Sequence, residues 1–503
     1  MTFYPLAPSE MSPDWLPHAK VIGLESDRQY GVAVLEHLYD EFARRARIIK
    51  PYGDNIAAYR RKVPDATMPR VVAIIDEFHV LFEEDDATTA RAVQLLERLA
   101  RRGRAYGIHL VLASQTISGI TSLMAKQDGI FSQFPIRVAL KNSASESRAV
   151  LDPHNSEAAR LRFRGEAVVN VDFGQPEGNR RAIIAAADPA EMERLRHGWW
   201  SRREPTAEPP AVFNGGESVT LLSVIPNLIE LRARARVDQA SPTALVGTPI
   251  AVARWPVGAA LPATPGRHLA VVGAGKRAVP YGASRAIEPD LAVGALHTAA
   301  ISLALQHPRG DAQFTILNYL GEAESKQNGM PYLVDVLQHL GFTPVVHSVA
   351  DATAALRQIA KDLTSRVVDS TTAHYVLAVA VDRAGTLENP DEMFAKPVDD
   401  LRSVLRDGPA RRTHVLGWWS SVGMFKSHLG YDAATGIDTI LALRVEQRDV
   451  TDLMGHSVAW SPQDNRGLLF DRTQLAQPVA IVPIAPLDHI SHAVLLRTEW
   501  DQR

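Results

Sequence analysis

The chain has no cysteine among its 503 residues, so disulfide bonds, thiolate metal sites and a cysteine nucleophile are excluded. None of its 17 histidines lies in an H-E-x-x-H pattern, which argues against a zinc protease. No run of 18 apolar residues occurs, so no membrane-spanning helix is predicted. Basic and acidic residues nearly balance, 54 against 57, and give no overall positive field of the kind that attracts nucleic acid.

A complete phosphate-binding loop is absent as well. Such a loop has the pattern G-x-x-x-x-G-K-[ST], in which backbone N–H groups and the lysine hold the phosphates and the hydroxyl binds Mg²⁺. No glycine before residue 76 is followed by lysine. The chain has a single Gly-Lys pair, Gly275-Lys276, and Arg277 follows it in place of serine or threonine.

Half of a nucleotide site is nevertheless present at residues 71–77. The aliphatic run Val71–Ile75 predicts a buried parallel strand, and Asp76 and Glu77 follow at its carboxyl end, where open α/β sheets place their ligands. In a P-loop nucleoside triphosphatase the first carboxylate holds Mg²⁺ through its water shell, and the second polarises the attacking water. The alternative is a strand that ends in a solvated acidic turn.

A second strand with a polar end follows. The apolar spacing of Val93, Leu95, Leu96 and Leu99 predicts a helix, which leads into the basic turn 101–107. The run 108–113 then predicts another buried strand, and Ser-Gln-Thr at 114–116 stands at its tip. Because the carboxyl ends of parallel strands meet at one sheet edge, this strand–helix–strand unit suits nucleotide chemistry. The alternative for the tip is an ordinary helix cap.

The segments IIDEF, ARRGRAYGIHLVLASQT and FPIRVALKNSASESRAVLD, between about Val71 and Asp152, resemble the motor domain of FtsK/SpoIIIE-type ATPases in residue types, order and spacing. The resemblance implies a RecA-like fold, ATP and Mg²⁺ as cofactors, and a homo-hexameric ring that threads a polymer. The site residues that it implies are the Walker B pair Asp76 and Glu77, the sensor Gln115, and Arg137 or Arg104 as an arginine that reaches a neighbouring subunit.

Length and linker chemistry predict a chain of two halves. The resemblance implies that they are tandem RecA-like α/β domains with mostly parallel sheets between helices. Residues 1–202 are expected to be a partial ATPase domain that lacks its phosphate loop. Residues 203–240, rich in Pro, Glu and Gly at their start, are expected to be a linker with a short helix over Leu221–Arg236. Residues 241–503 are expected to be a second, degenerate RecA-like domain. A surface loop within one large domain is the alternative interpretation of the linker.

The second half repeats the first in the spacing of its strands. Another apolar run ends at Asp382, and Ile440 follows it by 58 residues, as Arg137 follows Asp76 by 61. A strand running into the glycine turn at 273–276 precedes Asp382, and its counterpart in the first half would lie about 33 residues before Met1. We therefore expect an N-terminally shortened sequence. A natural protein without this loop is the alternative.

The second site is expected to be degenerate. Gly273, Gly275, Lys276 and Asp382 are its candidate nucleotide-binding residues, but Arg383 stands where the glutamate is expected, and Trp418-Trp419 stand in the sensor position. The helix predicted over 291–305 offers its N-terminus to a phosphate. The acidic residues just before it, Asp290 among them, argue against that use because they already satisfy the helix dipole.

Three functions remain open from the sequence. The first, which we favour narrowly, is ATP-driven translocation of duplex DNA. The second is a protein-export motor that resembles the EccC ATPases of type VII secretion, with a secreted protein as substrate. The third is a non-hydrolysing interaction module. The resemblance implies a place in the cytoplasm or at the inner face of the plasma membrane, in a membrane-anchored complex. Arginine outnumbers lysine 44 to 10, which favours a high-GC source such as an actinobacterium.

Overall fold

The computed structural model describes residues 17–23, 27–117, 130–204, 210–215, 218–236, 241–252, 255–276, 290–365, 372–385, 387, 396–430, 436–458, 460–473 and 477–500. The chain divides into two compact units, Met1–Glu217 and Ser218–Arg503, called unit 1 and unit 2 below. The division lies inside the predicted linker, residues 203–240. Arg277 lies outside the described residues.

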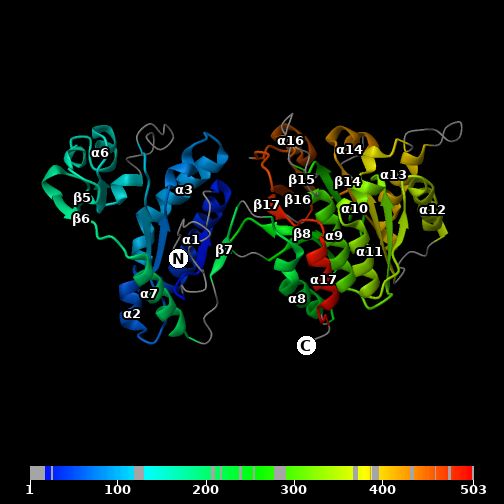
Figure 1. The fold of residues 1–503 in the computed structure, drawn as a ribbon, viewed down its shortest axis with the longest axis horizontal. Coiled ribbons are helices and arrows are strands. Elements are labelled where there is room, and N and C mark those ends of the chain that lie inside the picture. Colours follow the sequence, from blue (N-terminus) through cyan, green and yellow to red (C-terminus); the bar gives the residue numbers. More distant parts are fainter. Residues whose placement is uncertain are drawn as a thin grey trace. The chain divides into compact units, whose positions relative to one another are not determined.

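A parallel pair of strands, β2 (Val71–Ile75) and β3 (Ile108–Leu112), lies at the centre of unit 1 (Figure 1). The connection runs through a 3-10 turn and helix α3, which buries Leu95, Leu96 and Leu99 on one face. The strand–helix–strand order predicted from the sequence is therefore confirmed. The predicted burial of the strands is wrong for the described residues, because only Ala73 of β2 and Ile108 of β3 are buried. The helical elements around the pair are α1 (Arg28–Ile49), α2 (Ile56–Lys62), η2 (Phe78–Phe82), α3 (Ala87–Arg102) and η3 (Gly103–Tyr106).

The rest of unit 1 is a small antiparallel sheet of three strands, in the order β4-β5-β6. Val138 and Leu140 share one face of β4 and are 49% and 54% exposed, so the described residues leave that face largely uncovered. A further pair, β1 with β7, is parallel and ties residues 211–213 of the predicted linker to unit 1. The bounds are β1 (Val21–Gly23), η4 (Phe131–Gln133), β4 (Arg137–Leu140), α6 (Ala144–Val150), η5 (Glu157–Arg160), β5 (Glu166–Asn170), η6 (Pro176–Gly178), β6 (Asn179–Ile183), α7 (Pro189–Ser201) and β7 (Ala211–Phe213).

Unit 2 is built on a ten-stranded sheet in the order β12-β11-β13-β14-β10-β15-β16-β17-β8-β9. The strands from β12 to β15 are parallel, whereas β16, β17 and β9 pair antiparallel with their neighbours. The predicted, mostly parallel α/β sheet is thus confirmed. Its strands are β8 (Thr243–Pro249), β9 (Val257–Ala260), β10 (Leu269–Gly273), β11 (Ala312–Asn318), β12 (Val345–His347), β13 (Ala373–Val379), β14 (Thr413–Trp419), β15 (Thr439–Leu443), β16 (Gly467–Asp471) and β17 (Val479–Pro483).

Helices cover both faces of this sheet and enclose two apolar cores. One core gathers around α9, which is buried almost throughout because it is apolar on every side; the other lies under α12, α13, α14 and α16. The helix predicted over Leu221–Arg236 is present as η7 and α8. The helical bounds are η7 (Leu221–Val224), α8 (Ile225–Ala235), α9 (Leu291–Leu305), α10 (Glu322–Gln327), α11 (Met330–His339), α12 (Ala352–Ser365), η8 (Val381–Arg383), α13 (Pro397–Asp407), η9 (Pro409–Arg411), α14 (Val422–Leu429), α16 (Gln447–Met454) and α17 (His489–Arg497).

Distant parts of the sequence meet inside the unit 2 sheet. Strand β8 near the start of the unit pairs with β17 near its end, with Pro249 opposite Ile481. In the part of the chain that the structure describes, no helix is both long and apolar enough to cross a membrane.

The two units repeat one order of elements. Unit 1 runs β2, α3, β3, β4, α6, β5, β6, and unit 2 runs β13, α13, β14, α14, β15, α16, β16, β17. Helix α14 lies between β14 and β15, and the corresponding stretch of unit 1, between β3 and β4, includes residues 118–129, which lie outside the described residues. The pairings repeat too, because β2–β3 and β13–β14 are parallel while β4–β5–β6 and β15–β16–β17 are antiparallel. The internal repeat predicted from residue spacings is confirmed.

Candidate nucleotide sites in the two units

The carboxyl ends of β2 and β3 bring the predicted unit 1 residues together. Ile75 and Leu112 are paired, and the chain then turns so that the Gln115 Nε2 donates to Glu77 Oε1 at 2.7 Å. Asp76 is exposed beside them, and its Oδ1 accepts the Glu77 N–H at 2.9 Å. Glu77 has a φ of +47°, a left-handed conformation that is unfavourable for a residue with a Cβ. The acidic pair and the polar tip therefore form one cluster, as the strand pattern predicted.

His79 belongs to the same cluster, although no sequence pattern pointed to it. The Ser114 hydroxyl and the His79 ring nitrogen Nδ1 share a hydrogen bond of 2.8 Å, and this contact ties the turn after β2 to the tip of β3. A histidine two residues after an Asp-Glu pair carries no recognisable signal by itself. Only the pairing of the two strands shows its role in holding the cluster.

The two candidate arginines lie in different surroundings. Arg137, at the start of β4, donates Nε to Phe134 O at 3.1 Å and Nη2 to Phe131 O at 2.9 Å, and its Nη1 donates to Val150 O and Leu151 O. Burial lowers the pKa of Arg137. Its guanidinium joins the 3-10 turn η4 to the C-terminal end of α6 and would have to leave four carbonyl groups before it could reach a neighbouring subunit.

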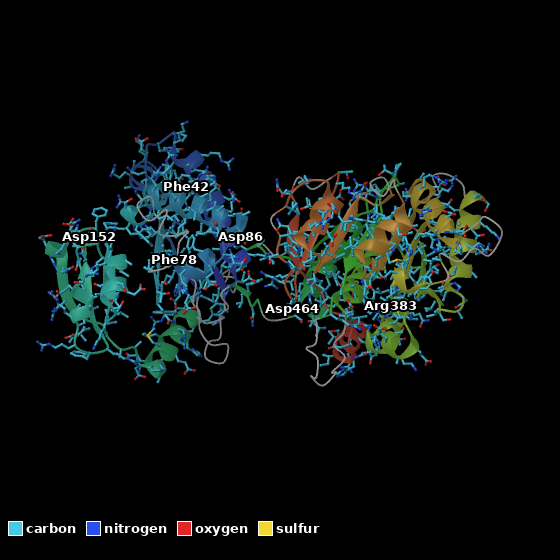
Figure 2. The ribbon with its side chains drawn as sticks, turned by 90° about the horizontal axis from the view of Figure 1, so that it is seen from above. Phe42, Phe78, Asp86, Asp152, Arg383 and Asp464 are labelled. Carbon is cyan, nitrogen blue, oxygen red and sulfur yellow. The ribbon has the colours of Figure 1, made fainter. Side chains whose placement is uncertain are left out.

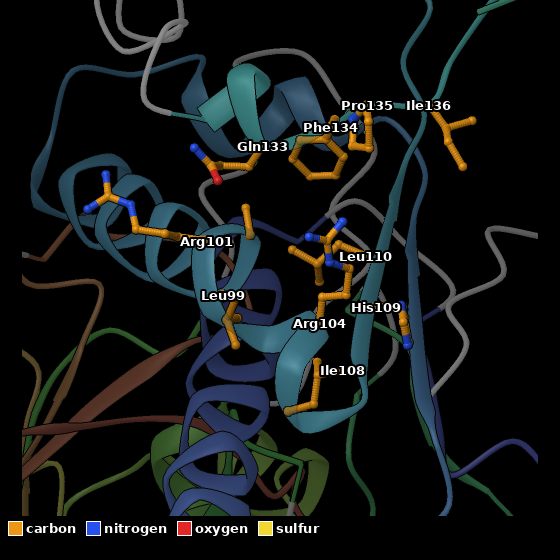
Figure 3. Close-up of a pocket in the computed structure, with 11 residues that line it drawn as sticks. Leu99, Arg101, Arg104, Ile108, His109, Leu110, Gln133, Phe134, Pro135 and Ile136 are labelled. Atoms are coloured by element: carbon orange, nitrogen blue, oxygen red, sulfur yellow. The ribbon is translucent and has the colours of Figure 1, made fainter. Parts of the chain in front are cut away.

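Arg104 is exposed and lines a pocket of about 250 Å³ between β3 and the residues before β4. Figure 3 shows Gln133 and Phe134 on one side of this pocket and Arg104 and Leu110 on the other. His109 also lines the pocket. Its Nε2 is buried without a hydrogen-bond partner among the described residues, and burial, with Arg70 and Arg104 nearby, lowers the pKa of His109. Of the two arginines, Arg104 has the freer side chain.

Unit 1 and unit 2 differ in the strands that flank this pocket. In unit 2, β10 lies between β14 and β15 and pairs in parallel with both. The corresponding strands of unit 1, β3 and β4, belong to separate sheets, and no described strand of unit 1 lies between them. The described part of unit 1 therefore has no counterpart of β10, the strand that leads into the glycine turn of unit 2.

Two backbone features fix how the units correspond. Glu77 and Ala380 both have positive φ, +47° and +58°, and each directly precedes the 3-10 turn after its strand. At the other end of the strands, Val71 N donates to Gly107 O at 2.8 Å, and His374 N donates to Arg412 O at 2.8 Å. Both features give the same register.

This register corrects the correspondence inferred from spacing by three residues. Asp382 was expected at the position of Asp76 and Arg383 at that of Glu77, but Val379 and Ala380 occupy those positions. Asp382 instead corresponds to His79. The strands themselves have the same spacing, because six residues separate Val71 from Glu77 and His374 from Ala380. The aspartates differ in place, since Asp76 directly precedes the left-handed residue whereas Asp382 follows it by two.

At the tip of β14 the correspondence changes less, because Trp419 takes the position of Ser114 as predicted. Trp418 and Trp419 are the buried last residues of that strand, and Ser420 corresponds to Gln115. The Asp382 carboxylate accepts Ser420 N at 3.1 Å, Ser420 Oγ at 2.6 Å and Ser421 N at 3.0 Å. It therefore fastens the turn before α14. Unit 2 has no carboxylate at either position of the Walker B pair.

The remaining candidate residues of unit 2 lie at the end of β10. Gly273 has a φ of +104°, and its carbonyl accepts the Trp418 Nε1 proton at 2.9 Å. Gly275 N donates to Asp290 Oδ1 at 3.1 Å, and Lys276 Nζ pairs with Glu324 at 2.9 Å. The lysine and the glycine N–H are thus engaged within the protein.

These arrangements decide how well each unit fits ATP and Mg²⁺. In unit 1, Asp76 and Glu77 suit a Mg²⁺ held through water and an attacking water, but the described residues offer no phosphate cradle. In unit 2 the cradle groups already have carboxylate partners. No cluster of three or more histidine, aspartate or glutamate side chains suited to a metal ion occurs among the described residues.

Comparisons with known proteins agree with this geometry. Residues 12–119 match the FtsK/SpoIIIE family. The ESX-5 secretion system protein EccC5 of Mycobacterium tuberculosis (strain ATCC 25618 / H37Rv) is 36% identical over 113 residues, 20% of this chain and 8% of that protein. The DNA translocase FtsK of Chlorobaculum tepidum is 32% identical over 148 residues, 27% of this chain and 17% of that protein. The chain thus spans less than a fifth of either relative.

Two solved structures resemble the chain over both units. The cytoplasmic domain of the Thermomonospora curvata type VII secretion ATPase EccC is 19% identical, with a TM-score of 0.57 over 94% of this chain and 55% of that one. ATPases 2 and 3 of EssC from Geobacillus thermodenitrificans are 14% identical, with a TM-score of 0.53 over 96% of this chain and 84% of that one. The predicted resemblance to FtsK/SpoIIIE-type ATPases and the fold of tandem ATPase domains are confirmed.

Proposed function

We propose that the chain is part of an ATP-driven motor of the FtsK/SpoIIIE type, in which unit 1 activates the attacking water and unit 2 does not hydrolyse. The observation that supports the role of unit 1 is the contact of 2.7 Å between Gln115 Nε2 and Glu77 Oε1. This contact joins the polarising carboxylate to the sensor across two neighbouring strand ends.

The roles of the unit 1 side chains follow from their positions. Asp76, exposed at the end of β2, would hold Mg²⁺ through its water shell, and bound Mg²⁺ supplies charge neutralisation for the phosphates. Because Gln115 engages Glu77 Oε1, the second oxygen of Glu77 is left to orient the attacking water. Gln115 thereby keeps the carboxylate in one orientation and couples it to the tip of β3.

In this proposal the phosphate cradle comes from a strand and loop that take the place of β10 between β3 and β4. The supporting observations are the parallel pairing of β10 with both neighbours in unit 2 and the pocket between β3 and the residues before β4 in unit 1. Since the 503 residues contain no complete phosphate loop, the strand would belong to polypeptide that this sequence does not contain. A hexameric ring at the inner face of the membrane is part of the same proposal.

We propose a polypeptide as the transported substrate. The solved EccC and EssC structures resemble this chain over 94–96% of its length, through both units. In sequence the two branches match similar shares of the chain, 20% for EccC5 and 27% for FtsK. The tandem architecture therefore favours the secretion branch over the DNA translocation that we favoured narrowly from the sequence. Duplex DNA remains a second candidate, because Arg101, Arg102 and Arg104 are exposed together on one turn and suit a phosphate backbone.

ATP hydrolysis by the assembly isolated with its natural partners tests the proposal. Glu77→Gln is expected to lower turnover on the order of 10³-fold with nucleotide binding retained, as for loss of a water-positioning group. Asp382→Asn, at a carboxylate that fastens a turn of unit 2, should leave turnover unchanged. The isolated 503-residue chain should hydrolyse little ATP. Robust turnover by that chain, abolished in Glu77→Gln, would show that the cradle lies within it.

The substrate is tested by the stimulation of turnover. Secreted proteins from the culture medium of the source organism are expected to stimulate hydrolysis, and linear duplex DNA is not. Stimulation by DNA that disappears when Arg101, Arg102 and Arg104 are replaced by alanine would instead establish the second candidate.

A further inference from the structure

In unit 2 the turn after β10 approaches the N-terminus of α9 closely. Gly275 lies so near to α9 that a Cβ at this position would collide with the Asp290 carboxylate and with the N–H groups of Leu291 and Ala292. A glycine turn set against the first N–H groups of a long helix is an arrangement that binds anions in many proteins. Here the anion is part of the chain.

The Asp290 carboxylate occupies this position. Its Oδ1 accepts Gly275 N at 3.1 Å and Ala292 N at 3.0 Å, and the residue is 2% exposed. The Asp290 N–H donates to Asn328 Oδ1 at 2.7 Å, which fixes the residue from the C-terminal end of α10. Burial raises the pKa of Asp290, and the bonds from Ala292 and Gly275 and the charge of Lys276 oppose this rise.

The cations of the same site also have a partner within the chain. Glu324, on α10, pairs with Lys276 at 2.9 Å through one oxygen and with Arg383 at 2.6 Å through the other. Figure 2 labels Arg383 in unit 2. Burial raises the pKa of Glu324, but the hydrogen bonds from Lys276 and Arg383 outweigh this effect and lower it. Glu324 is thus ionised and neutralises the lysine that would meet a phosphate.

We propose that unit 2 is closed to nucleotide phosphates by its own carboxylates. Asp290 takes the place of a phosphate oxygen at the N-terminus of α9, and Glu324 takes the place of one at Lys276. An incoming phosphate would have to displace a buried carboxylate from two N–H groups and would meet a second carboxylate beside the lysine. The proposal rests on the non-hydrolysing role of unit 2 and implies that this unit holds one conformation whatever the ATP concentration.

Thermal unfolding of the full chain in inorganic phosphate or ATP, at matched ionic strength, tests this closure. In the wild type, neither phosphate nor ATP is expected to change the unfolding temperature of unit 2. Hydrogen exchange of residues 291–305 reports on this unit and should likewise not respond. Asp290→Ser keeps a capping hydroxyl and removes the charge. We expect it to unfold at lower temperature without phosphate and to gain on the order of 2–4 °C with phosphate. Adding Glu324→Gln should lower the phosphate concentration required about tenfold, because Lys276 is then released.

Asp488→Ser is the matched control. Asp488 caps α17 by accepting Ser491 N at 2.7 Å, and no glycine N–H of the described residues donates to its carboxylate, so its replacement should cost stability without a phosphate response. A response of Asp290→Ser no larger than that of Asp488→Ser would overturn the proposal. The proposal would also be overturned if ATP slowed hydrogen exchange of residues 291–305 in the wild type and no longer did so in Lys276→Ala. This second measurement does not require a folded variant of Asp290. The proposal for unit 1 fails by a different measurement, namely ATP hydrolysis that persists in Glu77→Gln.

Discussion

Replacing Arg137 by methionine tests whether this arginine stabilises the fold of unit 1 or reaches the nucleotide of a neighbouring subunit. The guanidinium donates to four carbonyl groups, those of Phe131, Phe134, Val150 and Leu151, and methionine retains most of the aliphatic stem without any donor. At roughly 1 kcal/mol net for each hydrogen bond, with one of the four long at 3.4 Å, the loss should be about 3–4 kcal/mol. Arg137→Lys should recover only part, because one ammonium cannot serve both η4 and α6.

Peptide-level hydrogen exchange of the full chain measures this loss where it occurs. Residues 137–151 should exchange faster in Arg137→Met, since local opening of β4 and α6 becomes easier. Arg104→Met is the matched control, because that side chain is exposed and its replacement should change stability by no more than about 0.5 kcal/mol. Unchanged exchange in Arg137→Met, together with lost hydrolysis in the complete assembly, would refute the structural role and restore Arg137 as the residue that reaches a neighbour.

Three further predictions concern other parts of the molecule. Glu77→Gly should be more stable than Glu77→Ala by up to about 1 kcal/mol in urea unfolding, because only alanine keeps the left-handed strain at φ +47°; equal stabilities would show that the turn carries no strain. Burial lowers the pKa of His268 to about 3 and that of His414 to about 4, so the unfolded state binds more protons below pH 6.5. The stability that these histidines contribute should be complete above pH 6.5 and fall by several kcal/mol toward pH 4, at about 1.4 kcal/mol for each histidine and each pH unit; a flat profile in this range would contradict it. Asp382→Ala should cost about 2–4 kcal/mol in urea unfolding through the lost bonds to Ser420 and its neighbour, with unchanged hydrolysis in the complete assembly.

The sequence was sufficient for the unit 1 cluster because its signal is local. An aliphatic strand ending in Asp76-Glu77 and another ending in Gln115 must bring these side chains to one sheet edge once the strands are parallel. The 2.7 Å contact between Glu77 and Gln115 follows from that register. The prediction that acidic residues occupy the N-terminus of α9 also rested on a local signal, and Asp290 caps that helix.

The parts that could not be predicted depend on backbone turns and tertiary contacts. Counting residues aligned Asp382 with Asp76, but the left-handed Ala380 sets the true register three residues away. The sequence gives no sign of this conformation, because the residue is an alanine and not a glycine. The carbonyl partners of Arg137 come from the ends of η4 and α6, which meet only in the folded unit. The second bond of Asp290, to Gly275 N, depends on how the β10 turn approaches α9.

The pairing of β8 with β17 has a consequence for biosynthesis. Pro249 and Ile481, which face each other in the sheet, are separated by 232 residues, so at 5–20 residues per second the ribosome needs on the order of 10–50 seconds between them. Until β17 emerges, β8 keeps a bare edge and the apolar α9 lacks part of its cover. We therefore expect nascent unit 2 to bind chaperones during translation until β17 has emerged.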